Sequence, residues 1–270
     1  MIEPYKGIAG IYEEIRPSYP EQLISDIISV TSLNASEDQL LEVGAGTGKA
    51  TIPFAEKGYR IHAVELGEDM ADILREKCAK YSKVTTWVSS FEEWICRENM
   101  KYDMIYSAQA FHWMNKDIKY RKCHELLKEN GYLVLFWYQP SSRKSIQRME
   151  IDEQVAGIVE RYISELAKKP LKSDRTVLTG ITGNEERKKE IYESGLFRLI
   201  MEKEYTYEVI NRPEQYVKAM KSVPSYASVL DGLDPDQILK MDREIEEVIR
   251  KNGGYIKEEF DYSLYIARKR

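Results

Sequence analysis

The chain has 270 residues, 43% of them hydrophobic and 31% charged, and its formal net charge is −5. This composition is typical of an ordinary globular protein and excludes a disordered or fibrous one, and the length allows one α/β domain with an insertion. The negative charge provides no long-range attraction to nucleic acid or anionic lipid, and no apolar run approaches the roughly 20 residues that cross a bilayer, so we expect neither partner.

No feature of the sequence indicates export. The first residues lack a cationic stretch followed by an apolar core, so a secretory signal is not expected. The three cysteines, Cys78, Cys96 and Cys123, are widely spaced, which argues against a disulfide framework or a zinc site. We therefore expect a cytoplasmic protein with reduced thiols.

Residues 1–38 show no strand pattern and predict a helical N-terminal strap. A proline-punctuated segment containing Tyr12, Arg16 and Tyr19 leads into an amphipathic helix. This segment either packs on the sheet or closes over a ligand. Arg16 favours the second interpretation, because a guanidinium can hold a carboxylate through two parallel hydrogen bonds.

A glycine-rich turn follows the first predicted strand. Residues 40–43 form a short apolar run that contains Glu42, and Gly44, Gly46 and Gly48 follow it. Glycine permits positive φ angles and the close approach of a ligand at the mouth of a strand. A dinucleotide fingerprint needs glycine or alanine where Lys49 stands, and the Walker spacing also fails. The turn therefore predicts a nucleotide site of another kind.

Strand-like and helix-like segments then alternate with short connections. The predicted order is a helix at 48–57, a strand at 60–65, a helix at 69–81, a strand at 83–88, a short helix at 89–94, a strand at 102–107, a helix at 116–127, a turn at 130–131 and a strand at 132–138. The last run is almost wholly apolar, as central parallel strands are. This alternation predicts a doubly wound sheet with right-handed crossovers.

The alternation breaks in the second half of the chain. Helical spacing at 151–166 predicts an insertion, which is either a substrate cap or a helix that covers the sheet, and the polar stretch 178–189 joins it to a strand at 199–210. Helices are expected from Arg212 and from Asp234-Pro235. Alternating apolar residues over 256–266 predict an antiparallel strand with one wetter face.

These elements define an α/β fold class. We expect a Rossmann-like doubly wound seven-stranded sheet, mostly parallel with an antiparallel last strand, plus a helical cap insertion. The expected divisions of this single domain are a strap at 1–38, a binding core at 39–140, cap insertions at 141–195 and 212–233, and the C-terminal part of the sheet at 196–211 and 234–270.

Candidate binding groups follow the predicted strands at their carboxyl ends, where parallel sheets bind ligands. Glu65 ends the second strand, at a spacing typical of acids that accept hydrogen bonds from ribose hydroxyls. Ser90-Phe91 and the segment from Ser107 to Trp113 follow the third and fourth strands. Each alone is equally typical of packing or of solvated surface, but their order predicts one shared crevice.

The motifs, in this order, resemble those of a known family. Glu42-x-Gly44-x-Gly46-x-Gly48, Glu65, Ser90-Phe91-Glu92 and Gln109-Ala110-Phe111-His112-Trp113 are similar to motifs of class I S-adenosylmethionine-dependent methyltransferases of the small-molecule type, especially the trans-aconitate methyltransferase-like group. The resemblance is confined largely to the first half of the chain, where the segment around Arg16 shares it. Many relatives have aspartate where Ser90 stands, which leaves the adenine contact open.

The resemblance implies S-adenosylmethionine as the methyl donor and S-adenosylhomocysteine as the product. It implies the glycine turn against the methionine part, Glu65 on the ribose, Ser90-Phe91 near the adenine and Arg16 on the methionine carboxylate. The full set of candidate cofactor-binding residues is Arg16, Glu42, Gly44, Ala45, Gly46, Gly48, Glu65, Leu66, Ser90, Phe91, Ser107 and Ala108.

The catalytic and substrate-binding residues are less sharply indicated. His112 is the candidate general base because it follows the fourth strand, although a histidine that merely borders the cofactor explains it equally; His62 and His124 read as structural. The candidate substrate-binding residues are Tyr19, Trp113, Tyr138, Met220 and Tyr226. Core packing is the competing explanation for each of them.

The function predicted from the sequence is methyl transfer to a small molecule, with an oxygen of a carboxylate or hydroxyl as the expected acceptor. No metal is expected, and the protein is expected to be a monomer or homodimer. The alternatives are a non-catalytic S-adenosylmethionine-binding protein, an RNA or protein methyltransferase, and an NAD oxidoreductase, which Lys49 disfavours.

Overall fold

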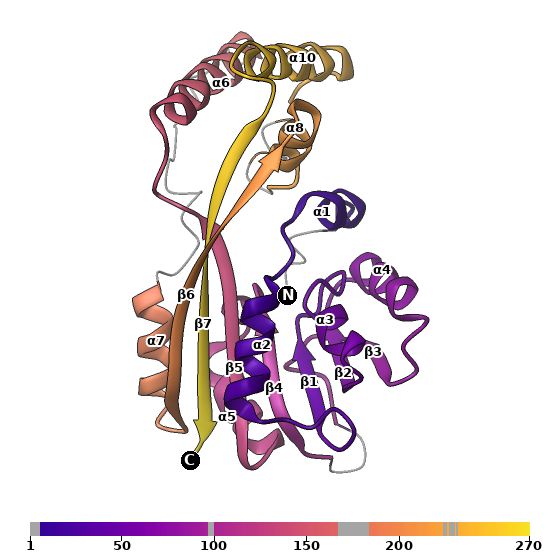
Figure 1. Cartoon of the computed structure of the whole chain (residues 1–270). Coiled ribbons are helices and arrows are strands. Elements are labelled where there is room, and N and C mark those ends of the chain that lie inside the picture. Colours follow the sequence, from indigo (N-terminus) through magenta and orange to yellow (C-terminus); the bar gives the residue numbers. More distant parts are fainter. Residues whose placement is uncertain (1–5, 97–99, 167–183, 224–225, 227–229, 231) are drawn as a thin grey trace.

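The computed structural model describes residues 6–96, 100–166, 184–223, 226, 230 and 232–270. In this part of the chain, seven strands form one sheet in the order β3-β2-β1-β4-β5-β7-β6 (Figure 1). The strands are β1 (Gln39–Val43), β2 (Arg60–Glu65), β3 (Val84–Val88), β4 (Tyr102–Ala108), β5 (Leu127–Pro140), β6 (Phe197–Asn211) and β7 (Ile256–Lys269). Only β7 runs antiparallel to its neighbours. The predicted fold class is confirmed.

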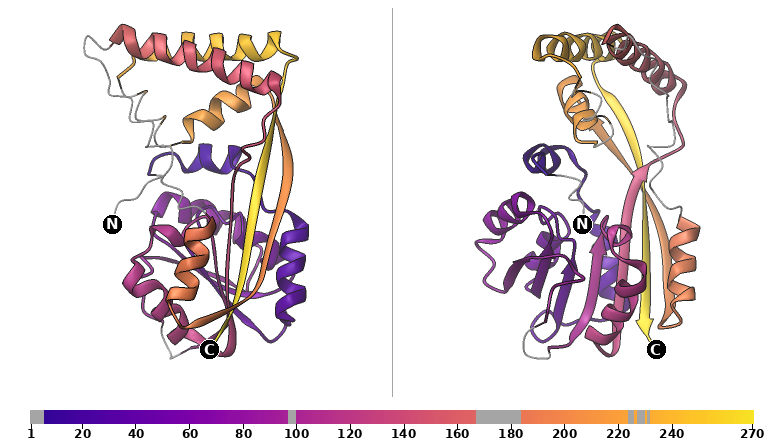
Figure 2. Two further views of the ribbon diagram at one scale, coloured as in Figure 1. Left: turned by 90° about the vertical axis from the view of Figure 1, so that its left-hand side faces the viewer. Right: turned by 180° about the vertical axis from the view of Figure 1, so that it is seen from behind.

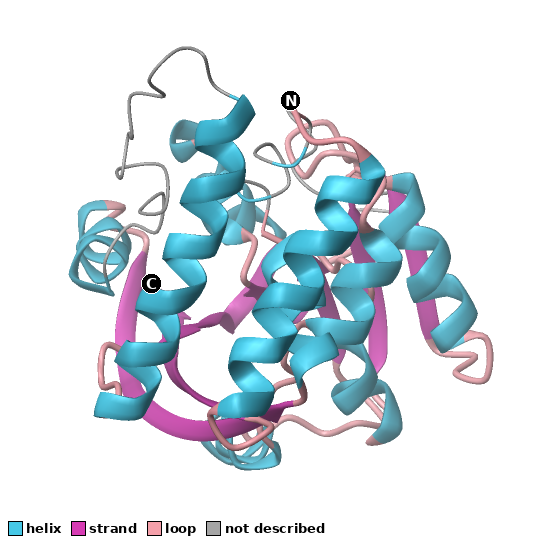
Figure 3. Ribbon diagram, turned by 90° about the horizontal axis from the view of Figure 1, so that it is seen from above, coloured by secondary structure: helices cyan, strands magenta, loops and turns pink. Residues whose placement is uncertain are grey.

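Helices cover both faces of this sheet. They are α1 (Ala9–Ile15), α2 (Glu21–Thr31), α3 (Thr51–Glu56), α4 (Glu68–Cys78), the 3-10 turn η2 (Phe111–Trp113), α5 (Lys116–Leu126), α6 (Ile146–Leu166), α7 (Asn184–Glu193), α8 (Pro213–Lys221) and α10 (Pro235–Lys251). Figure 3 shows several of them across the sheet from above. In β5, Phe136 packs with α2 and α3, whereas Leu135 packs with α5 and α7. Because successive strand residues face opposite sides, β5 is buried on both faces, as predicted.

Three long strands carry a separate helical cluster. At about 3.3 Å per residue, β5, β6 and β7 span roughly 45 Å, compared with about 17 Å for β1, so their ends project far beyond the sheet edge (Figure 2). Helices α6, α8 and α10 pack together on these ends around a core of their own that includes Val155, Val217 and Ile245. We call this three-helix cluster the cap.

The helices that form the cap are not the ones that the expected division of the chain assigned to it. Helix α10, expected to belong with the C-terminal part of the sheet, packs on α6 and α8 through its apolar face. Helix α7, expected to belong with the cap, lies against β6 and β7 instead, with Ile191 in the core of the sheet. Residues 184–189, predicted as a polar connection, form part of α7, and residues 178–183 lie outside the described residues. The exposed outer side of α7 explains its polar sequence.

Three smaller predictions need correction. The expected turn at 130–131 lies inside β5, where Asn130 adopts a φ of +66° within the strand. The expected helix at 89–94 is only a turn. Strand β7 alternates between buried and partly exposed residues only in its first half. Its second half is buried on both faces, because Leu264 and Ile266 pack in the cluster with α2 and α3, whereas Tyr265 packs in the cluster with α5 and α7.

Among the described residues, no helix has the length and apolar character needed to cross a bilayer.

Candidate functional site

A cavity of about 360 Å³ opens at the carboxyl ends of β1, β2 and β4. The strand register explains its position, because Val43 pairs with Val64 and Glu65 with Val88, so the segments that follow these strands start at one edge. The candidate residues that line this cavity are Gly44, Gly46, Glu65, Leu66, Ser90, Phe91, Ala108 and Trp113. A smaller adjoining cavity of about 30 Å³ is lined by Glu42, Ala45, Tyr19 and Tyr138, among others. We call the two together the glycine-turn crevice.

Two glycines of the turn fit this crevice for different reasons. Gly44 has a φ of +71°, and a Cβ there would lie 2.3 Å from the Cβ of Ala110, so the loop after β4 packs directly on it. Gly46 has a φ of +55°, and a Cβ there would meet no atom within 4 Å. Gly46 therefore presents bare backbone to the cavity, where a side chain would project into the space.

Gly48 does not line the crevice. Its φ is +85°, and a Cβ there would lie 2.6 Å from Cδ1 of Leu74 in α4. The contribution of Gly48 is thus the close packing of the turn on α4. Gly48 was a candidate cofactor contact, but the structure places it outside the lining of both cavities of the crevice.

Glu65 fastens the glycine turn to the end of β2. The Gly46 amide donates to Oε2 of Glu65 (2.7 Å), and the Gly67 amide donates to Oε1 (2.9 Å). The carboxylate lines the cavity while it holds the two loops that form its lip. A ligand with hydroxyl donors would therefore meet an acceptor that is already oriented.

Glu42 is fully buried beside the same crevice. Oε2 accepts hydrogen bonds from Oγ1 of Thr51 (2.5 Å) and from the hydroxyl of Tyr106 (2.9 Å). Oε1 is buried without a hydrogen-bond partner among the described residues. Burial raises the pKa of Glu42 to about 8, against the lowering effect of the two donors. The carboxyl group is thus prepared for a donor or a cation that completes its bonding.

Helix α1 bridges the glycine turn and the cap. Nζ of Lys77 contacts Oε1 of Glu13 (2.6 Å), and Nζ of Lys49 donates to the Glu13 carbonyl (2.7 Å). On the other side, Nη2 of Arg16 donates to the carbonyl of Ser222 at the end of α8 (3.1 Å). Arg16, expected at the ligand carboxylate, is thus bound to the cap here and is absent from the lining of the crevice.

Two further candidates lie outside the crevice. Ser107 is buried, and its hydroxyl donates to the carbonyl of Val43 (2.7 Å), which ties β4 to β1. His112 lines a separate cavity of about 20 Å³ against Arg187. Burial lowers the pKa of His112 to about 4, and the nearby positive charge of Arg187 lowers it further in the same direction, so the ring is neutral near pH 7. The structure therefore does not bring His112 together with Glu65.

The candidate substrate residues fall into two groups. Tyr19, Tyr138 and Trp113 line the glycine-turn crevice, and Trp113 stands at its rim with 54% of its surface exposed. Met220 and Tyr226 line a cavity of about 650 Å³ under the cap, which we call the cap cavity.

The cap cavity begins where the crevice ends on β5. Tyr138 lines the crevice and Pro140 the cap cavity, two residues further on the same face of the strand. This step along β5 corresponds to about 7 Å. The two cavities are therefore neighbours along one strand.

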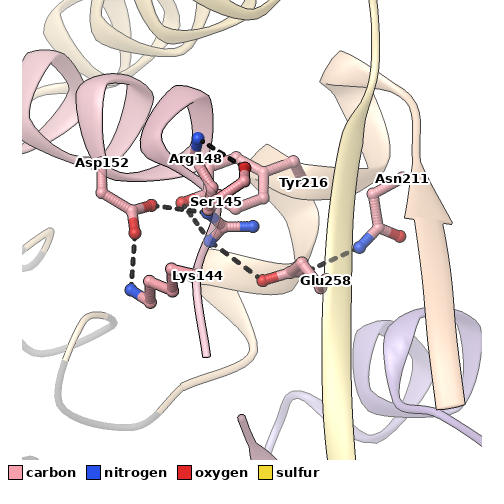
Figure 4. A network of polar contacts seen from close by, with 7 residues as sticks. All are labelled: Lys144, Ser145, Arg148, Asp152, Asn211, Tyr216 and Glu258. Atoms are coloured by element: carbon pink, nitrogen blue, oxygen red, sulfur yellow. Dashed lines mark hydrogen bonds and ion pairs between the residues drawn. The ribbon is translucent and has the colours of Figure 1, made fainter. Parts of the chain in front are cut away.

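Paired charges form one wall of the cap cavity (Figure 4). Nε of Arg148 donates to Oδ1 of Asp152 (2.8 Å), and Nη2 of Arg148 donates to Oε1 of Glu258 (3.1 Å). The amide of Asn211 donates to the other oxygen of Glu258 (2.6 Å), and Nζ of Lys144 contacts Asp152 (2.5 Å). Because each charge has a partner, this wall is satisfied without a ligand.

Several lining residues are not among the candidate cofactor-binding residues, although Gln109 belongs to the segment that the sequence placed after the fourth strand. Gln109 has a φ of +61°, which is uncommon outside glycine, and its side chain donates to the carbonyl of Tyr138 (2.8 Å). No spacing rule predicts that conformation. Gly67 and Met70 lie two and five residues after Glu65 and also line the cavity. The acid at the end of β2, followed by a glycine before α4, was a sufficient signal to suggest them. The described residues contain no group of three or more His, Cys, Asp or Glu that would hold a metal ion.

Comparisons with known proteins agree with this architecture. Residues 40–131 match a family model described as a methyltransferase domain. An uncharacterized methyltransferase of Mycobacterium tuberculosis is 33% identical over 133 residues, which cover 49% of this chain and 51% of the relative. The chain thus matches only about half the length of this curated relative.

Two solved structures share the fold over most of this chain. Phosphoethanolamine N-methyltransferase 2 of Haemonchus contortus, solved with phosphomonomethylethanolamine and S-adenosylhomocysteine, aligns with a TM-score of 0.53 at 14% identity, covering 97% of this chain and 56% of that one. The cyclase SpnF aligns with a TM-score of 0.54 at 16% identity, covering 94% and 84%. At these identities the likeness shows the fold alone. Within that fold, residues 40–131 are the part of the chain that is similar to a methyltransferase domain.

Proposed function

We propose that the protein is an S-adenosylmethionine-dependent methyltransferase whose glycine-turn crevice holds the cofactor. The single observation that carries the proposal is the pairing, in one crevice, of the bare Gly46 backbone with two carboxylates, Glu65 and the buried Glu42. The match of residues 40–131 to a methyltransferase domain covers this part of the chain and supports S-adenosylmethionine as the cofactor.

The residues of the crevice fit such a ligand. Gly46 leaves room for close approach, and Oε1 of Glu42 lacks a partner among the described residues. A cationic ammonium group bound there would donate to it and favour its ionised form over the protonated form that burial stabilises. Glu65 would accept from ribose hydroxyls in place of its present backbone donors, and Ser90-Phe91 would lie at the adenine. We keep Arg16 as the proposed partner of the methionine carboxylate, which requires release of its bond to Ser222.

The cofactor supplies a methyl group already activated by a positively charged sulfur. The work left to the chain is to hold an acceptor in line and to exclude competing water. Tyr19 and Tyr138 form one side of the crevice, and burial with the neighbouring Tyr138 raises the pKa of Tyr19 well above its usual value. The Tyr19 hydroxyl therefore stays protonated, which suits it to donate to an acceptor oxygen.

We propose a small-molecule acceptor that is methylated at a carboxylate or hydroxyl oxygen. The adjacency of Tyr138 and Pro140 on β5 supports an acceptor that enters between the crevice and the cap cavity, where Met220 and Tyr226 would contact its distal part. We propose further that the protein acts in the cytoplasm as a monomer or homodimer.

His112 remains a proposed base only for a hydroxyl acceptor, because a carboxylate needs none. Its low pKa keeps the imidazole neutral at pH 7 and makes it a weak base. A pH–rate profile of His112→Ala tests the role. An unchanged rate at every pH removes His112 from the chemistry.

The proposed function is tested by a screen with methyl-labelled S-adenosylmethionine against small acids, phenols and amines. We expect labelled product from at least one oxygen acceptor, and none with Gly46→Val. Donor binding without transfer to any class would identify a non-catalytic binding protein, and the absence of donor binding would contradict the proposal.

A further inference from the structure

A second, much smaller cavity lies behind the loop that follows β4. Its volume of about 20 Å³ holds about one water molecule, and it is lined in part by Ser107, Gln109, His112, Trp137, Arg187 and Glu190. Gln109 lines both this cavity and the glycine-turn crevice, as does Ala110. One loop therefore separates the two cavities. We call the smaller one the Arg187 cavity.

Arg187 extends from α7 into this cavity and is buried, with 7% of its surface exposed. Its guanidinium lies over the ring of Trp137, with Cζ 4.0 Å from the ring centroid. Nη1 is buried and has no hydrogen-bond partner among the described residues. Burial lowers the pKa of Arg187 to about 10, so the group still carries its charge at neutral pH.

A buried charge in this state is costly. Stacking on an aromatic ring offsets only part of the free energy that burying an uncompensated ion costs. Proteins retain such a group where a ligand completes its bonding. The free energy of unfolding of the ligand-free protein should therefore rise when the charge of Arg187 is removed.

The acidic side chain in the same cavity, Glu190, compensates the charge of Arg187 only in part, because it is shared with two lysines. Glu190 contacts Nζ of Lys119 at 2.8 Å and Nζ of Lys116 at 3.1 Å, and the hydroxyl of Tyr120 donates to it (3.4 Å). Lys119 is itself buried, so the two buried cations face one carboxylate. The cavity thus has a surplus of one positive charge, which a monoanion would balance.

We propose that the Arg187 cavity is a binding site for a carboxylate group. A guanidinium presents two parallel N–H donors that match the two oxygens of a carboxylate, and the neutral ring of His112 adds a polar neighbour. The small volume admits no more than formate or the carboxylate tip of a larger molecule in place of water, and it is too small for a tetrahedral phosphate. This proposal does not depend on methyl transfer.

The direct test compares thermal unfolding of the wild type, Arg187→Met and Arg198→Met while sodium formate replaces sodium chloride at constant ionic strength. Methionine keeps an apolar contact with Trp137 and removes the charge; Arg198 is an exposed arginine on the neighbouring β6. We expect formate to raise the Tm of the wild type and of Arg198→Met, and to leave the Tm of Arg187→Met unchanged. In chloride, Arg187→Met should be at least as stable as the wild type.

An equal response of Arg187→Met to formate would overturn the proposal, as would a loss of stability of this variant in chloride, which would mark Arg187 as a structural residue. A second measurement needs no variant: the Nε–H signal of Arg187 in the wild type is followed by NMR during a formate titration, and it should shift. An unmoved signal would also overturn the site.

The source of the carboxylate is identified by kinetics once an acceptor is known. If the acceptor supplies it, Arg187→Met should raise the KM for carboxylate-bearing acceptors about tenfold or more relative to their amides, with the donor KM unchanged. If a free anion occupies the site, acids and amides should respond alike while the formate-dependent Tm shift persists.

Discussion

The glycine-turn crevice and the cap cavity satisfy their polar groups in different ways. In the crevice, Glu65 is held by backbone amides and Glu42 retains a buried oxygen with no partner among the described residues. In the cap cavity, Arg148 is paired with Asp152 and Glu258. The crevice therefore retains an unused hydrogen-bonding position that a ligand could occupy, whereas the polar groups of this wall of the cap are paired with one another. Changes in the crevice should affect donor binding, and changes in the cap wall should affect stability.

The largest effect is expected from Gly46→Val. A β-branched side chain at positive φ is strained by about 1–3 kcal/mol, and at this position it also fills the cavity. We expect S-adenosylmethionine affinity to fall at least about 100-fold, because the ligand loses close contact with the backbone. Gly58→Val is the matched control, since Gly58 has a φ of +86° and open space beyond its Cα but lies outside the crevice. Equal losses of S-adenosylmethionine affinity in both variants would show that Gly46 has no specific part in binding the ligand.

The next effect is expected from Glu65→Ala. The substitution removes an ionic acceptor and frees the amides of Gly46 and Gly67. A hydrogen bond to a charged group contributes about 1.5–3 kcal/mol, so titration calorimetry should show roughly 10- to 100-fold weaker donor binding. Glu68→Ala, three residues later on α4 and outside the crevice, should bind as the wild type does. Wild-type affinity in Glu65→Ala would refute the site assignment.

Arg148→Met tests the cap side of the comparison. It leaves Asp152 and Glu258 without their shared cation, and Arg148 is largely buried, with 13% of its side chain exposed. We expect a loss of about 1–3 kcal/mol of unfolding free energy with donor affinity unchanged. Arg161 lies on α6, as Arg148 does, and forms an exposed pair with Glu244 of α10; Arg161→Met should cost less than about 1 kcal/mol. A large fall in donor affinity in Arg148→Met would show that the two cavities are not independent.

The smallest effect is expected from Glu42→Gln, and it is measured as a change in how the Tm depends on pH. The folded-state pKa of Glu42 lies above its unfolded value, at about 8 against 4.5, so between these values the unfolded chain ionises while the folded one stays protonated. Wild-type stability contributed by this group should therefore fall as pH rises through this window. We expect the Tm of the wild type to drop roughly 2–6 °C more than that of Glu42→Gln between pH 5 and pH 8. Parallel Tm curves would contradict the raised pKa.

The crevice could be predicted from the sequence because its signals are local. Glycines at fixed spacing, Glu65 at a strand end and Ser90 after the next strand each follow a short buried strand, and parallel strands bring their carboxyl ends to one edge. The conformation of Gln109 could not be predicted, because its positive φ belongs to the loop that packs on Gly44 through Ala110.

The cap was less predictable because it depends on contacts between distant segments. The apolar face of α10 has the same pattern whether it covers a sheet or another helix, so the sequence of Met241 and Ile245 did not indicate α6 as the partner. The polar sequence of α7 concealed Ile191, which packs in the core of the sheet. The neighbourhood of Arg187 and His112 was unpredictable for the same reason, because their cavity lies between two segments that are distant in the sequence, α7 and the loop after β4.

The most direct test of the central claim is a calorimetric titration of the wild type with S-adenosylmethionine, S-adenosylhomocysteine and NAD. We predict one site per chain for the first two ligands, mutual competition between them, and no binding of NAD. Binding of NAD with no heat from S-adenosylmethionine would contradict the assignment of the glycine-turn crevice.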